Sequence, residues 1–145
     1  MRTRLRANER TERGAAAVEF AFIMLPLLLV MCGIINFGMV FAQQLSLDNA
    51  TRAAARAGVV DADVDIAARA QTEFDSTLAR GQAGDVTVDF SGGVGATCEG
   101  SDLGDLMVVN AQVSTDVLIP WLFPDSLLPG TFELESEAAF QCEYS

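Results

Sequence analysis

The chain has 145 residues, half of them hydrophobic, which allows one modest domain or one domain plus an anchor. It contains no histidine and no lysine, which excludes imidazole acid–base chemistry, histidine-ligated metal sites and lysine Schiff bases. Twenty acidic residues against nine arginines give a net charge of −11, which argues against binding the phosphate backbone of a nucleic acid.

The charge is distributed unevenly along the chain. Residues 1–13 carry a net charge of +3, whereas residues 14–145 carry −14, and no basic residue follows Arg80. The first residues therefore differ physically from the rest. We divide the chain into a leader at 1–14, an N-terminal helix for membrane insertion and assembly at 15–58, and an exported acidic domain at 59–145.

Residues 20–42 form an uncharged run of 23 residues in which Asn36 is the one clearly polar side chain. As a helix this run is about 35 Å long, enough to cross the hydrocarbon core of a bilayer. A small protein cannot easily surround a helix that is apolar on all faces, whereas membrane lipid can, so a buried soluble helix is the weaker interpretation. The arginine-rich leader predicts a cytoplasmic N-terminus and an exported C-terminal domain.

One alternative interpretation stays open for the apolar run, and another for Glu19, which precedes it. An ordinary secretory signal could be cleaved after Ala42, although the apolar run is longer than a usual signal core. Glu19 stands one residue before the run, where a carboxylate is costly unless it is interfacial or paired. It could be a simple interfacial acid on the first helical turn.

The sequence Arg13-Gly14-Ala15-Ala16-Ala17-Val18-Glu19-Phe20 resembles a class III prepilin processing site, with a basic leader, a glycine and a glutamate at the fifth mature residue. The apolar residues that follow, and the stretch from Asn49 to Gly58, resemble the TadE-like family. The resemblance is detailed over residues 13–58. It implies a pseudopilin or minor pilin of the tight-adherence (Tad, Flp or type IVc) pilus system.

The resemblance also implies roles for particular residues and partners. A prepilin peptidase would cut between Gly14 and Ala15, and Glu19 followed by Phe20 would serve assembly by pairing with the new N-terminal ammonium group. Such a pair offsets the cost of a lone buried carboxylate and sets the register between subunits. The implied partners are the peptidase, other pilins or pseudopilins and the Tad inner-membrane platform. The implied location is the bacterial cytoplasmic membrane in a single pass, and the pilus at the cell surface.

Beyond the membrane we expect the first helix to continue to a stop at Gly58, with one polar side that includes Gln43, Ser46 and Arg52. A second helix is predicted over residues 61–80, with acids near its start and Gly81 at its end. Hydrophobic residues in this helix recur every four positions; they are Ile66, Ala70, Phe74 and Leu78.

Alternating patterns then predict three strands, each with one apolar face. The inward residues are Val86, Val88 and Phe90; then Met107, Val109, Ala111, Val113, Thr115 and Val117; then Phe132, Leu134, Ala138, Phe140 and Cys142. The fold class is therefore α+β, with a three-stranded antiparallel sheet packed on helices in a pilin-like exported domain. The apolar loop 119–130 is expected to cover the small core.

Cys98 and Cys142 are the two cysteines of the exported part, and an oxidising location favours a disulfide between them, worth about 4 kcal/mol on the chain-entropy model. Two thiols without further ligands are too few for a metal site. The spacing Asp61-x-Asp63-x-Asp65 invites a calcium interpretation, but Ile66 stands where a calcium-binding loop needs glycine.

The favoured function is structural, as a pilin-like subunit, with no enzyme activity, catalytic residues, cofactor or metal. A membrane-anchored extracytoplasmic ligand-binding or sensing domain with an uncleaved anchor is the alternative. An enzyme that uses paired acids, as in glycoside hydrolysis, is weaker because the acids show no convergent pair. Whether the subunit belongs to the tip, the shaft or the assembly machinery stays open.

Overall fold

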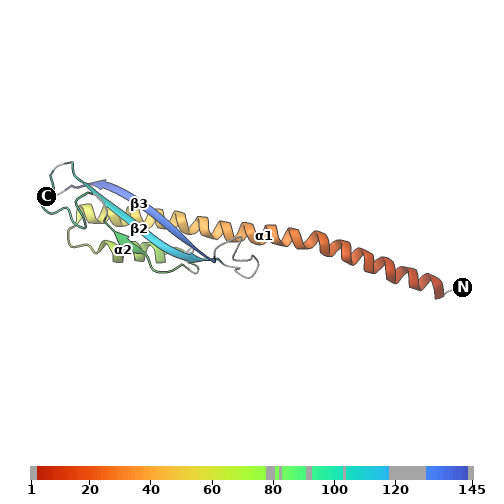
Figure 1. The fold of residues 1–145 in the computed structure, drawn as a ribbon. Coiled ribbons are helices and arrows are strands. Elements are labelled where there is room, and N and C mark those ends of the chain that lie inside the picture. Colours follow the sequence, from red (N-terminus) through yellow and green to blue (C-terminus); the bar gives the residue numbers. More distant parts are fainter. Residues whose placement is uncertain are drawn as a thin grey trace. The chain divides into compact units, whose positions relative to one another are not determined.

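The computed structural model describes residues 3–77, 81, 83–90, 93–102, 104–117 and 130–143, with side chains described from Gly14 onward. The described elements are α1 (Thr3–Val60), α2 (Ile66–Asp75), β1 (Thr87–Asp89), β2 (Leu106–Asp116) and β3 (Thr131–Gln141) (Figure 1). The chain divides into two compact units, Met1–Ile35 and Asn36–Ser145. The α+β class is confirmed, with a long N-terminal apolar helix, a second helix and a three-stranded antiparallel sheet.

Helix α1 does not stop at Gly58 as predicted, but continues to Val60. The glycine is needed there for packing. A Cβ atom at position 58 would lie 2.5 Å from the Ile66 Cδ1 atom and 3.1 Å from the Met107 Sδ atom. Gly58 therefore allows α1 to approach the start of α2 and the sheet closely, at the cost of about 1 kcal/mol in helix propensity.

Helix α2 is shorter than the predicted 61–80. The Asp65 side chain caps its N-terminus by accepting a hydrogen bond of 3.0 Å from the Ala68 N–H, and Ser76 caps its C-terminus. The Asp61 carboxylate instead accepts from the Asp63 N–H at 3.1 Å, which forms a turn before the helix. The predicted apolar stripe is buried at Ile66, Ala70 and Phe74; Leu78 lies outside the described residues.

The sheet has the strand order β1-β2-β3, and both pairs are antiparallel. Strand β2 is central, and its pairing with β3 runs without interruption from Leu106 opposite Gln141 to Asp116 opposite Thr131. The alternation predicted for β2 is confirmed, because every second residue from Met107 to Val117 is buried. Strand β1 is only three residues long, and Val86 is buried just before it begins.

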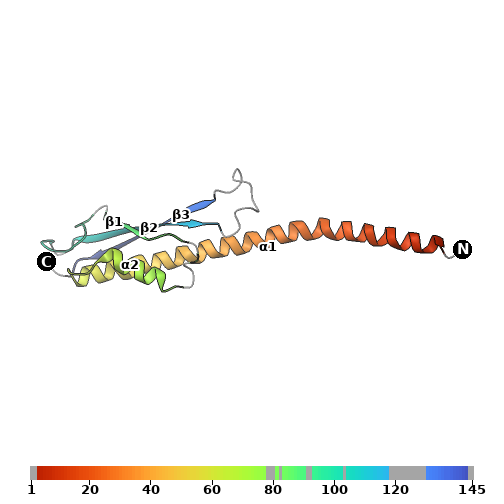
Figure 2. The ribbon, with the colours of Figure 1, turned by 90° about the horizontal axis from the view of Figure 1, so that it is seen from below.

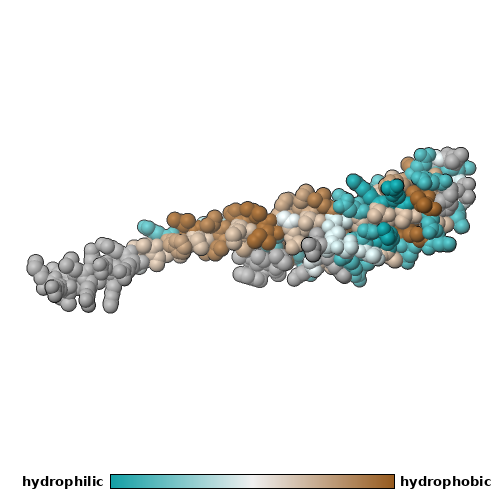
Figure 3. Space-filling view, turned by 180° about the vertical axis from the view of Figure 1, so that it is seen from behind, coloured by the Kyte–Doolittle hydropathy of each residue, from teal (hydrophilic) through white to brown (hydrophobic). Residues whose placement is uncertain are grey.

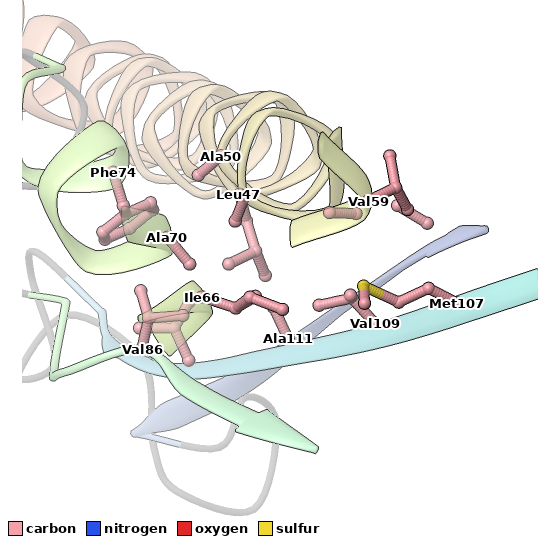
Figure 4. Packing of buried hydrophobic residues seen from close by; sticks show 14 of the residues in the cluster. Leu47, Ala50, Val59, Ile66, Ala70, Phe74, Val86, Met107, Val109 and Ala111 are labelled. Carbon is pink, nitrogen blue, oxygen red and sulfur yellow. The ribbon is translucent and has the colours of Figure 1, made fainter. Parts of the chain in front are cut away.

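The core of the second unit lies between the sheet and the two helices (Figure 4). The largest fully buried apolar side chains are Phe74 from α2, Leu47 from α1, and Met107 and Val109 from β2. Both α2 and the C-terminal part of α1 lie on the same side of the strands (Figure 2). The other side of the sheet carries the alternate residues of each strand, which are mostly polar; Leu106, Val108 and Ala139 are the apolar ones among the strand residues described.

The polar side predicted for α1 is partly wrong, because Gln43 and Ser46 are buried in the second unit. The Gln43 Oε1 atom accepts a hydrogen bond of 2.7 Å from the Thr115 hydroxyl, and both side chains are about 1% exposed. Their bond removes most of the cost of burying two polar groups. The neighbouring Gln44 amide donates to the Glu135 carbonyl at 2.8 Å, which ties α1 to strand β3.

A disulfide joins Cys98 to Cys142, with a Cα–Cα distance of 5.7 Å and a sequence separation of 44. Both residues are buried. The bond fixes the loop between β1 and β2 to the end of β3, where the Cys142 N–H also donates to the Asp105 carbonyl at 2.9 Å. Loop 119–130, expected to cover the core, lies outside the described residues up to 129.

Replacing Leu47 by alanine should lower the free energy of unfolding of the second unit by about 3 kcal/mol, because it leaves a cavity in the core. Leu45→Ala is the matched control on the same helix, since Leu45 is 48% exposed, and it should cost less than about 1 kcal/mol. Chemical denaturation of the detergent-solubilised chain measures both values. Equal losses in the two variants would contradict the packing described here.

Removing the disulfide by Cys98→Ser together with Cys142→Ser should cost about 2–5 kcal/mol, because the unfolded chain gains conformational freedom. Cys32→Ser, outside the disulfide, should leave stability unchanged. Non-reducing peptide mapping of exported protein provides the direct check. Recovery of Cys98 and Cys142 in unlinked peptides would contradict the pairing.

Candidate functional site

Residues 14–20 form a continuous stretch of α1 in which every side chain is exposed. Gly14 has the backbone conformation of an ordinary helical residue, without a positive φ angle. A Cβ atom added at position 14 would meet nothing within 4 Å. Neither backbone conformation nor packing within the described chain therefore requires glycine at this position, in contrast to Gly58.

Glycine does have a local effect on the helix. In a helix interior it is about 1 kcal/mol less favourable than alanine, because it leaves the backbone more freedom in the unfolded state. The peptide bond between Gly14 and Ala15 thus lies at a weak point of an otherwise good helix-forming sequence. Among the side chains described, from Gly14 onward, none packs over this peptide bond.

Glu19 follows Ala15 by one helical turn, so the two residues lie on the same face of α1. The Glu19 side chain is exposed, and no hydrogen bond or ion pair of its carboxylate is found among the residues described. If the chain began at Ala15, its ammonium group and the Glu19 carboxylate would lie close together at the positive end of the helix. The predicted site residues Gly14, Ala15, Glu19 and Phe20 are therefore consecutive parts of one exposed helix segment.

A large apolar surface begins at Val18 and continues along α1 through Ile35. It is seen as the brown stretch of the helix that follows the grey N-terminal end (Figure 3). In the first unit the exposed hydrophobic residues are Val18, Phe20, Phe22, Ile23, Leu25, Leu27, Leu28, Val30, Met31, Ile34 and Ile35. The span from Gly14 to Val60 contains an 18-residue window of mean hydropathy 2.5, none of which is buried. By length and composition α1 could therefore cross a membrane, and it differs from a core helix of a soluble protein, which would be mostly buried.

Pro26 lies inside this apolar stretch of α1. Because proline has no backbone N–H, the carbonyl of Phe22 loses its usual helical donor. In hydrocarbon such a carbonyl is satisfied by a neighbouring helix or by local adjustment. Gly33 and Gly38 follow, and a Cβ at either position would meet nothing within 4 Å. Like Gly14, they are not required by packing within the described chain.

The comparison with protein families decides how this segment is interpreted. The model of the family described as TadE-like protein matches residues 14–56. Over residues 14–56, named here the TadE-like segment, the chain is similar to this family. The match begins at Gly14 and ends at Arg56, and it contains Glu19, the whole apolar run and most of the part of α1 that packs on the sheet. No curated protein and no solved structure gives a significant match to this chain.

The acidic residues outside the TadE-like segment do not converge on a metal site. Among the residues described, no group of three or more histidine, cysteine, aspartate or glutamate side chains is placed to hold a metal ion. Asp65 caps α2 and Asp61 closes the preceding turn, so two carboxylates of the calcium-like spacing have structural partners. The outer face of the sheet has a shallow hollow of about 320 Å³, lined by Asp89, Glu135 and Glu137 among others.

The polar side predicted for α1 is confirmed at Arg52, which is exposed, as is Arg56. Sequence reasoning missed how the strands combine their acids. The register brings Asp89 of β1 and Glu137 of β3 onto one face of the sheet, on either side of Asn110. This arrangement depends on strand pairing, which the sequence does not specify.

Proposed function

We propose that this chain is a minor pilin or pseudopilin of a Tad-type pilus, anchored in the membrane and cut by a prepilin peptidase after Gly14. The TadE-like match over residues 14–56 carries the proposal. Its first residue is the glycine that the fold itself does not require. A requirement imposed by an external peptidase explains why glycine stands at this exposed position of the helix.

After cleavage the mature chain begins at Ala15, with the Arg-rich leader left in the cytoplasm and the sheet-containing unit exported. The new ammonium group pairs with Glu19 of the same chain or of a neighbour. In a dry bundle of apolar helices this pair offsets the cost of burying either charge alone, and it fixes the axial register between subunits. Partners in the proposal are other pilins or pseudopilins and the Tad inner-membrane platform, and the outcome is pilus assembly and adhesion.

In this proposal the chain is not an enzyme, and its exported unit serves to position the helix within an assembly. Two properties support a structural role. The exposed apolar surface of α1 needs lipid or other helices to cover it. The hollow on the outer face of the sheet is shallow and lined mainly by polar side chains, unlike the apolar, enclosed sites typical of small-molecule binding.

Gly14→Arg should leave the precursor uncut, because a long charged side chain would obstruct the peptidase at the scissile bond. The expected result is a loss of at least about tenfold in processed protein, equivalent to 1.4 kcal/mol or more in the barrier. Glu9→Gln is the matched control. It raises the net charge of the leader by the same one unit, by removing an acid, and it should be processed normally. Immunoblots of membranes from cells with and without the peptidase measure this. Normal processing of Gly14→Arg would contradict the proposal.

Glu19→Ala should insert and be processed, because the apolar run and the leader are unchanged, but should fail to assemble. We expect surface pili to fall about tenfold or more, since the new ammonium group then lacks its charged partner. Glu19→Gln should fail similarly, whereas Glu19→Asp, which keeps the charge, should assemble in part. Surface pilus yield is compared with the amount of processed protein in the membrane. Normal pilus yield from Glu19→Ala would mean that Glu19 is only an interfacial acid.

A further inference from the structure

The second unit carries opposite charges on opposite sides. One is the arginine stripe, defined as Asn49, Arg52 and Arg56 on the exposed face of α1. The other is the outer sheet face, defined as Asp89, Asn110, Gln112, Glu135 and Glu137. The buried residues of α1 face the sheet, and the stripe lies about half a helical turn away from them. Asn49 and Arg52 therefore point away from the outer sheet face, whereas Arg56 also borders a hollow at the end of β3 that Phe140 and Glu143 help to line.

The two arginines of the stripe form no ion pair with the residues that the structure describes. Arg69 on α2 forms an ion pair with Glu73, but neither Arg52 nor Arg56 forms an ion pair with any residue that the structure describes. Both side chains are exposed. They are two of the four arginines that remain after residue 13, in a region of net charge −14. They are therefore available to an anionic partner surface.

The outer sheet face carries acids on the two edge strands, Asp89 on β1 and Glu135 and Glu137 on β3, on either side of the neutral Asn110 and Gln112 of β2. The register places Asp89 opposite Asn110 and Asn110 opposite Glu137, and the next row places Gln112 opposite Glu135. No strand residue is basic, because the sequence has no basic residue after Arg80. The three carboxylates give this face a negative charge that no basic strand residue balances, so it is complementary to a cationic partner. Its hollow of about 320 Å³ gives room for long side chains.

The two surfaces also lie at the same height along α1. Gln43 is bonded to Thr115, and Gly58 lies against Met107, so β2 runs alongside α1 between these two points. Asn110 is three residues from Met107 and five from Thr115, which places its row of the sheet beside about residue 52 of α1. By the same reasoning Gln112 lies beside about residue 49. Arg52 is therefore level with Asn110, the central member of the row that contains Asp89 and Glu137. The hydrogen bond from Gln44 to the Glu135 carbonyl places the β3 end of the next row nearer residue 44, so the rows cross α1 obliquely.

We propose that the arginine stripe of one copy docks on the outer sheet face of a second copy standing beside it. The contact is head-to-tail, because the two surfaces differ and lie on opposite sides. A pair of copies then leaves one arginine stripe and one outer sheet face open, so further copies can add at both ends and form a row. The proposal rests on the proposed function for the parallel orientation of the copies in one membrane. It adds to that function a contact between exported units, separate from the pairing at Glu19.

A second copy is favoured over other occupants by its charge. The same chain supplies both complementary surfaces, at matching heights, in a form that membrane anchoring would hold parallel. An anionic lipid surface could meet the arginines, but it would leave the acidic face without a partner. A row of copies satisfies both faces together.

Disulfide cross-linking tests the contact in full-length protein reconstituted in lipid vesicles without other pilus components. Asn49→Cys and Gln112→Cys are introduced in a Cys32→Ser background, since these positions are level and lie at the edge of the charged contact. Mild oxidation should give dimers and longer ladders on non-reducing gels. The yield should fall with added salt, because exposed charges are screened.

Charge-reversal variants in this background test whether Arg52 and Glu137 form the contact between copies. Arg52→Glu and Glu137→Arg should each lower the cross-linking yield about tenfold, and the two together in one chain should restore it. Arg69→Glu and Glu99→Arg, reversals of exposed charges elsewhere, should leave the yield unchanged. The native Cys98–Cys142 bond, checked by peptide mapping in each variant, reports that the unit is folded.

A yield that is insensitive to both reversals would overturn the proposal, and so would loss without recovery in the combined variant. Recovery of Arg52→Glu by added anionic lipid, with Glu137→Arg behaving as the parent, would assign the stripe to the membrane and also overturn it. Processing after Gly14 is followed in separate samples from cells. Failure of the contact with normal processing would leave the proposed function intact, and failure of processing alone would leave the contact intact.

Discussion

An apolar helix surface that no described part of the chain covers is the constraint on which this molecule depends. From Phe20 onward α1 presents large hydrophobic side chains outward, and the most apolar window of the helix has no buried residue. Burying such a surface is worth roughly 25 cal/mol per Å², so in water it would drive aggregation or association. Lipid and neighbouring helices are the environments that remove this cost while leaving the helical hydrogen bonds intact.

The second unit, Asn36–Ser145, answers a different requirement. It must pack the C-terminal part of the same helix into a folded core, and few large side chains are buried in that core. Gln43 and Thr115 form a buried hydrogen bond, Leu47 fills the core, and Gly58 lets α1 touch Ile66 and Met107. The disulfide between Cys98 and Cys142 then fixes a loop that buries little apolar surface of its own. A small unit of this kind relies on such a crosslink because its core is limited.

The strands were predictable because the period of two is clear where one sheet face is buried and the other is exposed, as at Met107 to Val117. The bounds of α2 were not, because the Asp65 side chain caps the helix and leaves the earlier acids in a turn. Gly58 was read as a helix stop when it serves close packing. That reason depends on Ile66 and Met107, which are distant in sequence. Gln43 was predicted to lie on the exposed polar side of α1 for the same reason. The hydrogen bond that allows its burial comes from Thr115, which is 72 residues away in the sequence.

Gly14 is the position where sequence, structure and family comparison meet. It is helical, exposed and unconstrained by packing, and it is the first residue of the TadE-like match. The central claim is that this glycine marks the boundary between leader and mature protein. The intact mass of the wild-type chain extracted from membranes of cells that carry the pilus machinery measures it most directly. The account predicts a mature protein that lacks residues 1–14 and begins at Ala15. A chain that still begins at Met1, or one that begins at Gln43 as after ordinary signal cleavage, would contradict it.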